Sequence, residues 1–326
     1  MRRWFAVDET AERRRLLESL EPVEDVTIDD ENVAKLVEIY DSIYGFMAGH
    51  LSRAARLLAR CLSDADLRVI SFTANLVATG LRGILAQLIR ERVFNLVVTT
   101  CGTVDHDIAR GTGHRYYKGY FEADDRELRR LEIHRLGNIF IPFENYGPPV
   151  EKTTYRVLDG LDRNREWGIY EILWEIGREL RDGILRAAVE TSTPVIVPGY
   201  LDGAFGTALF TYMQTHRDLK INPFKDEEVM ANRFFSAKKA VGLLIGGGIS
   251  KHHSIWWAQF REGFDCVVYM TTAVEYDGSL SGAHPREAIS WGKVRPEAGH
   301  IVVYGDATIL LPPIAAYLLR RLRRRE

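Results

Sequence analysis

Reactive side chains cluster in the stretch "PREAISWGK", which ends at Lys293. Lys293 follows Trp291 and a glycine, and Glu287 precedes it by six residues. Proline favours the first position of a helix and glycine the residue that ends one, so we expect a short helix that begins at Pro285 and stops at Gly292. Lys293 then lies on a fixed bend rather than on a mobile helix face. A surface lysine after a short helix is the alternative interpretation.

A second group of reactive side chains is the pair His252 and His253, which ends the stretch "GGGISKHH". The pattern places both histidines at the start of a helix that follows a glycine-rich turn. A neutral imidazole there can accept or donate a proton over a ligand crevice. A helix-capping or surface histidine is the alternative.

The elements that position these groups are six short apolar runs that alternate with helical stretches. Each run ends in small or polar residues, and the runs are "LRVISFT", "NLVVTT", "TPVIVPGY", "VGLLI", "DCVVYMTT" and "HIVVYG". Such alternation predicts an α/β fold with a doubly wound, mainly parallel sheet of six or more strands, buried on both faces. Residues 30–63 show apolar residues at three- and four-residue spacing and predict two helices broken near Tyr44 and Gly45. We therefore expect a helical N-terminal extension over residues 1–60 and a Rossmann-like sheet domain over 61–326, within one structural domain.

The carboxyl ends of parallel strands meet at one edge of a sheet, where ligands of such folds bind. Small residues at this edge let backbone amides approach a phosphate or ribose, so a dinucleotide is the expected ligand. The chain has no G-x-G-x-x-G after its first strand, and tight packing of a strand-to-helix turn also explains Gly246 to Gly248.

Composition excludes several classes of protein. The 326 residues are 46% hydrophobic, enough for a substantial core, and the formal net charge of -2 argues against binding to nucleic acid. The three cysteines, Cys61, Cys101 and Cys266, are widely spaced without a C-x-x-C, so we expect neither a disulfide framework nor a metal site and place the protein in a reducing cytoplasm. No signal peptide or apolar segment of membrane-spanning length is present, and no zincin, nucleophile-elbow or phosphate-loop motif occurs.

Seven motifs in order resemble the deoxyhypusine synthase family over about residues 32–319. They are "TANL", "TTCGTVDHD", "FENYG", "LDGAFG", "LLIGGGISKHH", "TTAVEYDGSLSGAHPREAISWGK" and "VYGDATILLPP". An archaeal-type or divergent member of this family is expected to be a transferase that uses NAD and spermidine to form deoxyhypusine on one lysine of translation initiation factor 5A.

The resemblance also assigns roles to residues of the last long motif. Lys293 is expected to be the nucleophile that carries the butylamine group as an imine, and burial against an indole favours the neutral amine that attacks. His252 is expected to handle the proton of the secondary amine, Glu287 to hold an ammonium end, and Trp291 to pack along the methylene chain. Two further residues are expected to approach the substrate through their backbone: Gly278 and Ser279.

For the cofactor, the family pattern falls on the residues that follow the predicted strands. The expected NAD-binding residues are Ala74, Asn75, Thr100, Cys101, Gly102, Asp202, Thr272, Ala273, Asp277, Asp306 and Ala307. The resemblance further implies a homotetramer with active sites at dimer interfaces, in which residues 1–30 cover a neighbouring site.

The chain departs from the family pattern mainly where the amine is expected to bind. Leu280 and Thr207 replace aspartates, and Asp105 and His106 stand where glutamates are usual. Each positive charge of a polyamine that is buried without a carboxylate costs several kcal/mol. We therefore expect Asp105 and Glu287 to anchor the amine.

These departures leave two alternatives to a deoxyhypusine synthase. One is a paralogous NAD-dependent amine transferase with another donor or acceptor, such as agmatine or a homospermidine-type reaction. The other is an NAD-binding regulatory subunit of an active paralogue.

Overall fold

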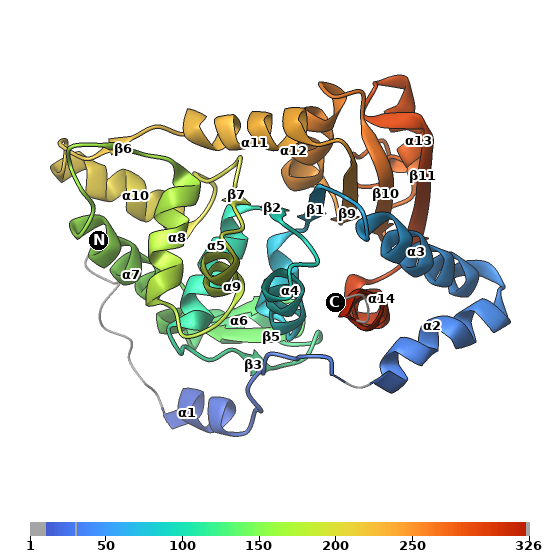
Figure 1. Cartoon of the computed structure of the whole chain (residues 1–326). Coiled ribbons are helices and arrows are strands. Elements are labelled where there is room, and N and C mark those ends of the chain that lie inside the picture. The colour runs from blue at the N-terminus through green and yellow to red at the C-terminus, as the bar shows by residue number, and fades with distance from the viewer. Residues whose placement is uncertain (1–10, 30, 324–326) are drawn as a thin grey trace.

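The main sheet of this computed structural model has six parallel strands in the order β11-β10-β9-β1-β2-β7 (Figure 1). The structure describes residues 11–29 and 31–323. The strands are β1 (Leu67–Ser71), β2 (Leu96–Val98), β7 (Val195–Ile196), β9 (Ala240–Ile245), β10 (Phe264–Thr271) and β11 (Val294–Tyr304). Each contains part of one predicted apolar run, so the predicted mainly parallel sheet is confirmed.

The order of the strands creates a switch point in the middle of the sheet. The chain runs outward from β1 to β2 and β7, then returns to β9 beside β1 and continues to β10 and β11. In open α/β sheets a ligand crevice lies outside the carboxyl ends of the strands at such a reversal. The predicted doubly wound topology is therefore also confirmed.

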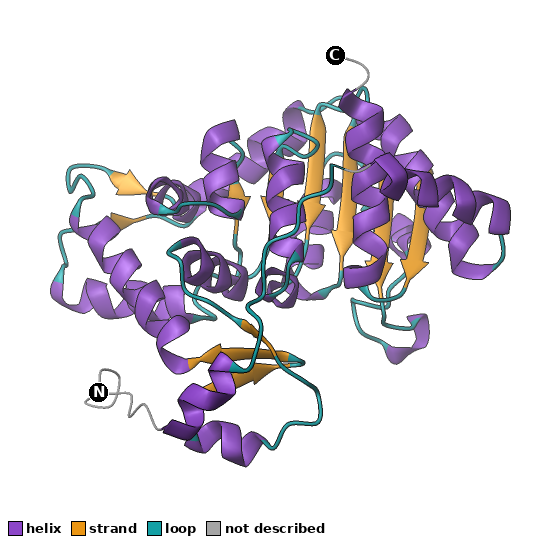
Figure 2. Cartoon of the chain, turned by 90° about the horizontal axis from the view of Figure 1, so that it is seen from below, coloured by secondary structure: helices purple, strands orange, loops and turns teal. Residues whose placement is uncertain are grey.

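Helices cover both faces of the sheet (Figure 2). Val69 and Ile70, successive residues of β1, belong to the two hydrophobic cores on opposite faces, as the two-residue period of a strand requires. One core includes residues of α3 (Phe46–Leu62), α4 (Leu81–Arg90), α5 (Cys101–Gly111), α9 (Ile184–Thr191) and α14 (Ala307–Arg323). The other includes residues of α11 (Phe224–Ser236), α12 (Gly248–Gln259) and α13 (Pro285–Ser290).

The N-terminal helices are α1 (Ala11–Glu18), α2 (Glu31–Ile43) and α3. The predicted break between α2 and α3 is confirmed, because Tyr44 and Phe46 on either side of Gly45 have φ of 59° and 50°, values that interrupt the regular helical backbone. Both helices pack against α14, and α3 also packs against β11. The domain boundary that we predicted after residue 60 falls within α3.

The expectation that the cysteines form no disulfide is wrong. Cys61 of α3 is joined to Cys266 of β10, 205 positions later in the chain. Cys101 is a buried free cysteine. Spacing along the sequence cannot show this pair, because α3 and β10 meet only through the packing of the sheet.

Two small sheets were not predicted. β3 (Tyr117–Lys118), β5 (Ile139–Pro142) and β4 (Ile133–Leu136) form an antiparallel sheet, while β6 (Glu166–Trp167) pairs with β8 (Lys220–Ile221). The remaining elements are η1 (Ala74–Ala78), α6 (Asp125–Arg130), η2 (Phe143–Asn145), α7 (Gly147–Asp159), α8 (Ile169–Glu179), α10 (Ala204–Thr215) and η3 (Glu275–Asp277). The antiparallel sheet leads through η2 into α7, which packs against α10. No helix in the described part of the chain is long and apolar enough to cross a lipid bilayer.

Candidate active site

A cavity of about 300 Å³ lies between α12, α13 and the segment that follows η3. Four of the residues singled out in the sequence line it together: His252, Glu287, Trp291 and Lys293. The structure therefore brings the "SWGK" lysine and the "KHH" histidine into one site, although 41 positions separate them in the sequence.

The local sequence fixes the position of Lys293 as predicted. Pro285 is the first residue of α13, and the ring of His284 caps the helix by accepting a hydrogen bond from the backbone N–H of Arg286 at 3.1 Å. Gly292 has φ of +67°, a conformation that favours glycine, and the backbone N–H of Lys293 donates to the carbonyl of Ala288 at 2.9 Å. The lysine thus leaves a closed turn and enters β11.

Lys293 is only 8% exposed, so it is not a surface lysine. Its Nζ lies 5.1 Å from the centre of the Trp291 ring and 6.0 Å from that of Trp256. Within the described residues, Lys293 forms no salt bridge with a carboxylate. The amine therefore lies beside aromatic rings and is largely shielded from water, an environment that is suited to nucleophilic chemistry.

His252 contributes a second titratable group beside this amine. Its ring stacks on Trp256 with 5.8 Å between the ring centres. Burial lowers the pKa of His252, and the nearby Lys293 and His253 lower it further. A neutral imidazole next to the lysine can accept a proton during a reaction.

Sequence reasoning missed Lys251, which is 1% exposed and lines the same cavity. Its Nζ donates hydrogen bonds to the carbonyls of Leu280 at 2.6 Å and Ala283 at 2.9 Å, and lies 4.1 Å from the centre of the Tyr269 ring. Burial lowers the pKa of Lys251 to about 8, against the opposing effect of Glu287. The lysine fastens the segment after η3 to α12 and so shapes one wall of the cavity.

The predicted cofactor residues follow the carboxyl ends of the strands. Asn75 lies in η1 after β1, Cys101 and Gly102 begin α5 after β2, and Asp306 and Ala307 follow β11. Because all six strands are parallel, the residues that follow them lie at one edge of the sheet.

The backbone at this edge fits a dinucleotide. α5 and α12 begin without a side-chain cap, so their first N–H groups are left for a ligand or for water. Gly246, in the turn before α12, has φ of +79°. Helix N-termini that follow glycine-rich turns bind anionic pyrophosphate groups. The NAD-binding roles of the individual residues remain predictions.

Comparison with known proteins decides the family. The family model for deoxyhypusine synthase matches residues 35–318. The chain belongs to the deoxyhypusine synthase family. It is 55% identical over 311 residues to a protein of Ignicoccus hospitalis named as a probable deoxyhypusine synthase. The alignment covers 93% of this chain and 97% of the relative. A relative of the same name from Sulfolobus acidocaldarius is 53% identical over 91% of this chain and 97% of its own length.

The fold also agrees with the deoxyhypusine synthase family. A crystal structure assigned to deoxyhypusine synthase of Entamoeba histolytica superimposes with a TM-score of 0.59 at 14% identity, over 87% of this chain and 92% of that one. Membership of the family makes the protein a transferase.

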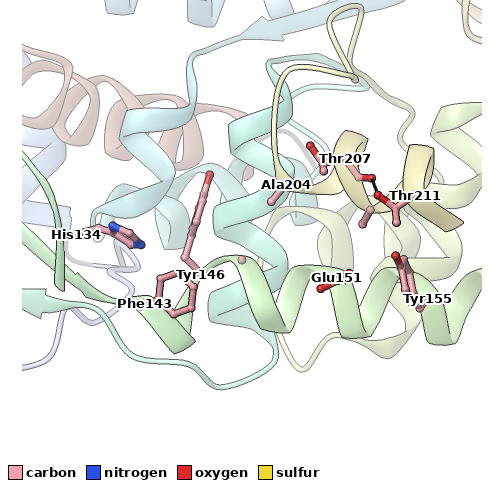
Figure 3. Close-up of a pocket in the computed structure, with 10 residues that line it drawn as sticks. His134, Phe143, Tyr146, Glu151, Tyr155, Ala204, Thr207 and Thr211 are labelled. Carbon is pink, nitrogen blue, oxygen red and sulfur yellow. Dashed lines mark hydrogen bonds between the residues drawn. The ribbon is translucent and has the colours of Figure 1, made fainter. Parts of the chain in front are cut away.

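The residues that depart from the deoxyhypusine synthase pattern lie in two different places. Leu280 lines the cavity that contains Lys293. Thr207 instead lines a second cavity, of about 660 Å³, between α7 and α10 (Figure 3). The two cavities share no lining residue. In Figure 1, α7 and α10 lie far from α13, at the other side of the molecule.

Asp105 and His106 lie behind this second cavity and are buried. The carboxylate of Asp105 accepts hydrogen bonds from the backbone N–H groups of Ala204 at 2.9 Å and Phe205 at 2.8 Å, and from the hydroxyl of Tyr146 at 3.0 Å. Burial raises the pKa of Asp105 despite these donors. Its carboxylate therefore caps α10, and its expected role in amine binding remains a prediction.

Gly278 and Ser279 do not line the cavity of Lys293, although they precede the Leu280 carbonyl that Lys251 holds. Gly278 has φ of +73°, and the backbone N–H of Ser279 donates to Asp277 at 2.6 Å. The structure thus places them in one turn beside the site.

Proposed function

We propose that this protein transfers the butylamine group of spermidine to a lysine of translation initiation factor 5A, with NAD as cofactor and Lys293 as the covalent carrier. The observation that carries the proposal is the buried position of Lys293 on a fixed turn, in one cavity with His252 and Glu287. Family membership supports the same activity. A cytoplasmic location is part of this proposal.

The residues of the cavity can divide the reaction between them. NAD, when bound, would supply the hydride acceptor for oxidation of the donor and the hydride for the final reduction. His252 takes the proton of the secondary amine as that amine is oxidised to an imine, and the Lys293 amine then attacks the imine carbon, which releases 1,3-diaminopropane. The acceptor lysine would displace Lys293 in the same way, which leaves an imine on the acceptor that is then reduced to the product amine.

Glu287 and Trp291 can hold the donor during these steps. Glu287 supplies the only carboxylate among the described residues of this cavity and suits an ammonium end of the donor. Trp291 is 65% exposed and offers its ring to the methylene chain. An exposed indole beside a reactive lysine also suits a site that a second subunit covers.

The proposed assembly is a homotetramer in which two subunits share each site. It is supported by the separation of Thr207 and Lys293, which the family pattern assigns to one amine site, into two cavities of the same chain. Trp256 of α12, near Lys293, and Phe260, which follows that helix and contacts Trp256, are exposed and add apolar surface for such a contact.

Covalent trapping tests the activity. With NAD and spermidine, borohydride should fix a butylamine adduct on Lys293 that mass spectrometry locates, and Lys293→Arg should abolish it because a guanidinium stays protonated. An adduct that forms only with another amine would identify a paralogous transferase, which Leu280 and Thr207 favour. Bound NAD without an adduct from any amine would contradict the catalytic proposal.

A further inference from the structure

The larger cavity, between α7 and α10, has walls suited to an aliphatic amine. Aromatic rings of Phe143, Tyr146 and Tyr155 line it, together with the small side chains of α10 (Figure 3). Its volume of about 660 Å³ is within the range of small-molecule sites. Aromatic faces attract organic cations, and apolar walls accommodate a methylene chain.

Glu151 is the only carboxylate among the described residues that line this cavity, and no lysine or arginine lines it. The side chain is half-buried and forms no salt bridge within the described part of the chain. Burial raises the pKa of the Tyr155 phenol, and the neighbouring Glu151 carboxylate raises it further through its charge and a hydrogen bond with the phenol. Burial, followed by the charge of Arg129, also lowers the pKa of His134, which disfavours a positive charge on this ring. Among the described residues, no lysine or arginine side chain therefore lines the cavity beside the Glu151 carboxylate.

Thr207 faces Glu151 across the cavity, from α10 to α7 (Figure 3). The Thr207 hydroxyl donates to the carbonyl of Gly203 at 3.0 Å, so it is turned toward its own helix. Asp105 is fully buried, with three hydrogen bonds from the protein. Thr207 has no carboxylate and the carboxylate of Asp105 is held by the protein, whereas the carboxylate of Glu151 lies at the cavity wall beside the Tyr155 hydroxyl.

We propose that Glu151 binds a primary alkylammonium group of the reactants and supplies, from α7, the carboxylate that α10 lacks at Thr207. This inference rests on the proposed function, since it assigns the amine-binding residue of that reaction. Because a buried ammonium needs a paired charge, Glu151 is expected to determine which amines are accepted.

Glu151→Gln tests this role with little change in shape. The apparent KM for spermidine should rise roughly 10- to 100-fold, as for a lost charged hydrogen bond, while kcat and the melting temperature stay close to wild type. Glu122→Gln, an exposed carboxylate outside the cavity, is the matched control and should change none of these values.

Moving the charge across the cavity provides a rescue. In the Glu151→Gln background, Thr207→Asp should restore most of the affinity, because position 207 faces the same space. A purely structural role of Glu151 in α7 would not be rescued from α10.

Donors acetylated on one terminal amine identify the group that is bound. If Glu151 pairs with a donor ammonium, acetylation of that amine should raise the KM of the wild-type protein for the donor. It should cause no additional rise in the KM of Glu151→Gln. If it pairs with the acceptor lysine, the variant should instead raise the KM for the acceptor protein.

An unchanged KM for both donor and acceptor in Glu151→Gln would overturn the inference. That result is distinct from failure of the proposed function, in which wild type forms no Lys293 adduct at all. In that case, calorimetry with spermidine still tests the site: equal binding by wild type and Glu151→Gln would also reject it.

Discussion

Lys251 is a buried cation whose hydrogen-bond partners are two backbone carbonyls. The ammonium holds Leu280 and Ala283 and lies against the Tyr269 ring, without a salt bridge in the described residues. We regard it as a positioning residue, because it fixes one wall of the cavity that contains Lys293 rather than reacting itself. Its removal should therefore loosen the site more than it alters the chemistry.

Lys251→Met is expected to raise the KM for the amine donor about tenfold, since two hydrogen bonds to the segment are lost. The borohydride adduct should still form on Lys293 at saturating donor. Steady-state kinetics of the variant, beside the exposed-lysine control Lys220→Met, measures the effect. A tenfold loss of kcat at unchanged KM would show that Lys251 acts in the chemistry instead.

The pH dependence of stability gives a second test of Lys251. Its pKa of about 8 in the folded protein lies below the usual 10.5, so the unfolded chain binds more protons between these values. The cost of burying the ammonium is fully present below pH 8 and disappears as the pH rises toward 10.5. The unfolding free energy of wild type minus that of Lys251→Met should therefore increase between these pH values in denaturant titrations. A constant difference would mean that Lys251 titrates normally.

The gathering of His252, Glu287 and Lys293 could be predicted because short, well-marked turns position each of them. The presence of Lys251 in this cavity could not be predicted, although Lys251 directly precedes His252 in the chain. Whether a helical lysine points inward depends on the segment near Leu280, about 30 positions later, and no local pattern contains that contact. Glu151 was missed for the same reason, since α7 and α10 meet only in the fold.

At the scale of elements, the disulfide fastens α3 to β10 across one face of the sheet. The six strands could be predicted from their apolar runs, but β3 and β4 are short and contain charged residues. Pairing of Cys61 with Cys266 depends on how α3 crosses the sheet, which spacing does not encode.

Because Cys61 and Cys266 are joined, we expect thiol titration of the protein denatured without reductant to detect one thiol, that of Cys101. Closing a loop of this length stabilises the fold by up to roughly 5 kcal/mol on the chain-entropy model, so reduction should lower the melting temperature by several degrees. The double variant Cys61→Ala, Cys266→Ala should have the lower melting temperature of the reduced protein, and reductant should not change that temperature. Titration of three thiols without reductant would refute the pairing.

At the scale of the whole molecule, the sheet separates two cavities that the proposed reaction needs together. Lys293 lies in one and Thr207, with Glu151, in the other, and the two share no residue. A single chain cannot bring them together without refolding. Contact between the Lys293 face of one subunit and the α7–α10 face of another would complete each site.

Mixed oligomers test this arrangement directly. Lys293→Ala lacks the carrier, and Thr207→Trp should block the larger cavity, so each variant alone should be inactive. After unfolding and refolding together, random pairing makes half of the dimers hybrids, and each hybrid has one site with both an intact Lys293 and an open cavity. Activity of about a quarter of wild type is expected for a two-fold symmetric pair. If each site belonged to a single chain, the mixture would stay inactive, because no chain in it carries both intact parts.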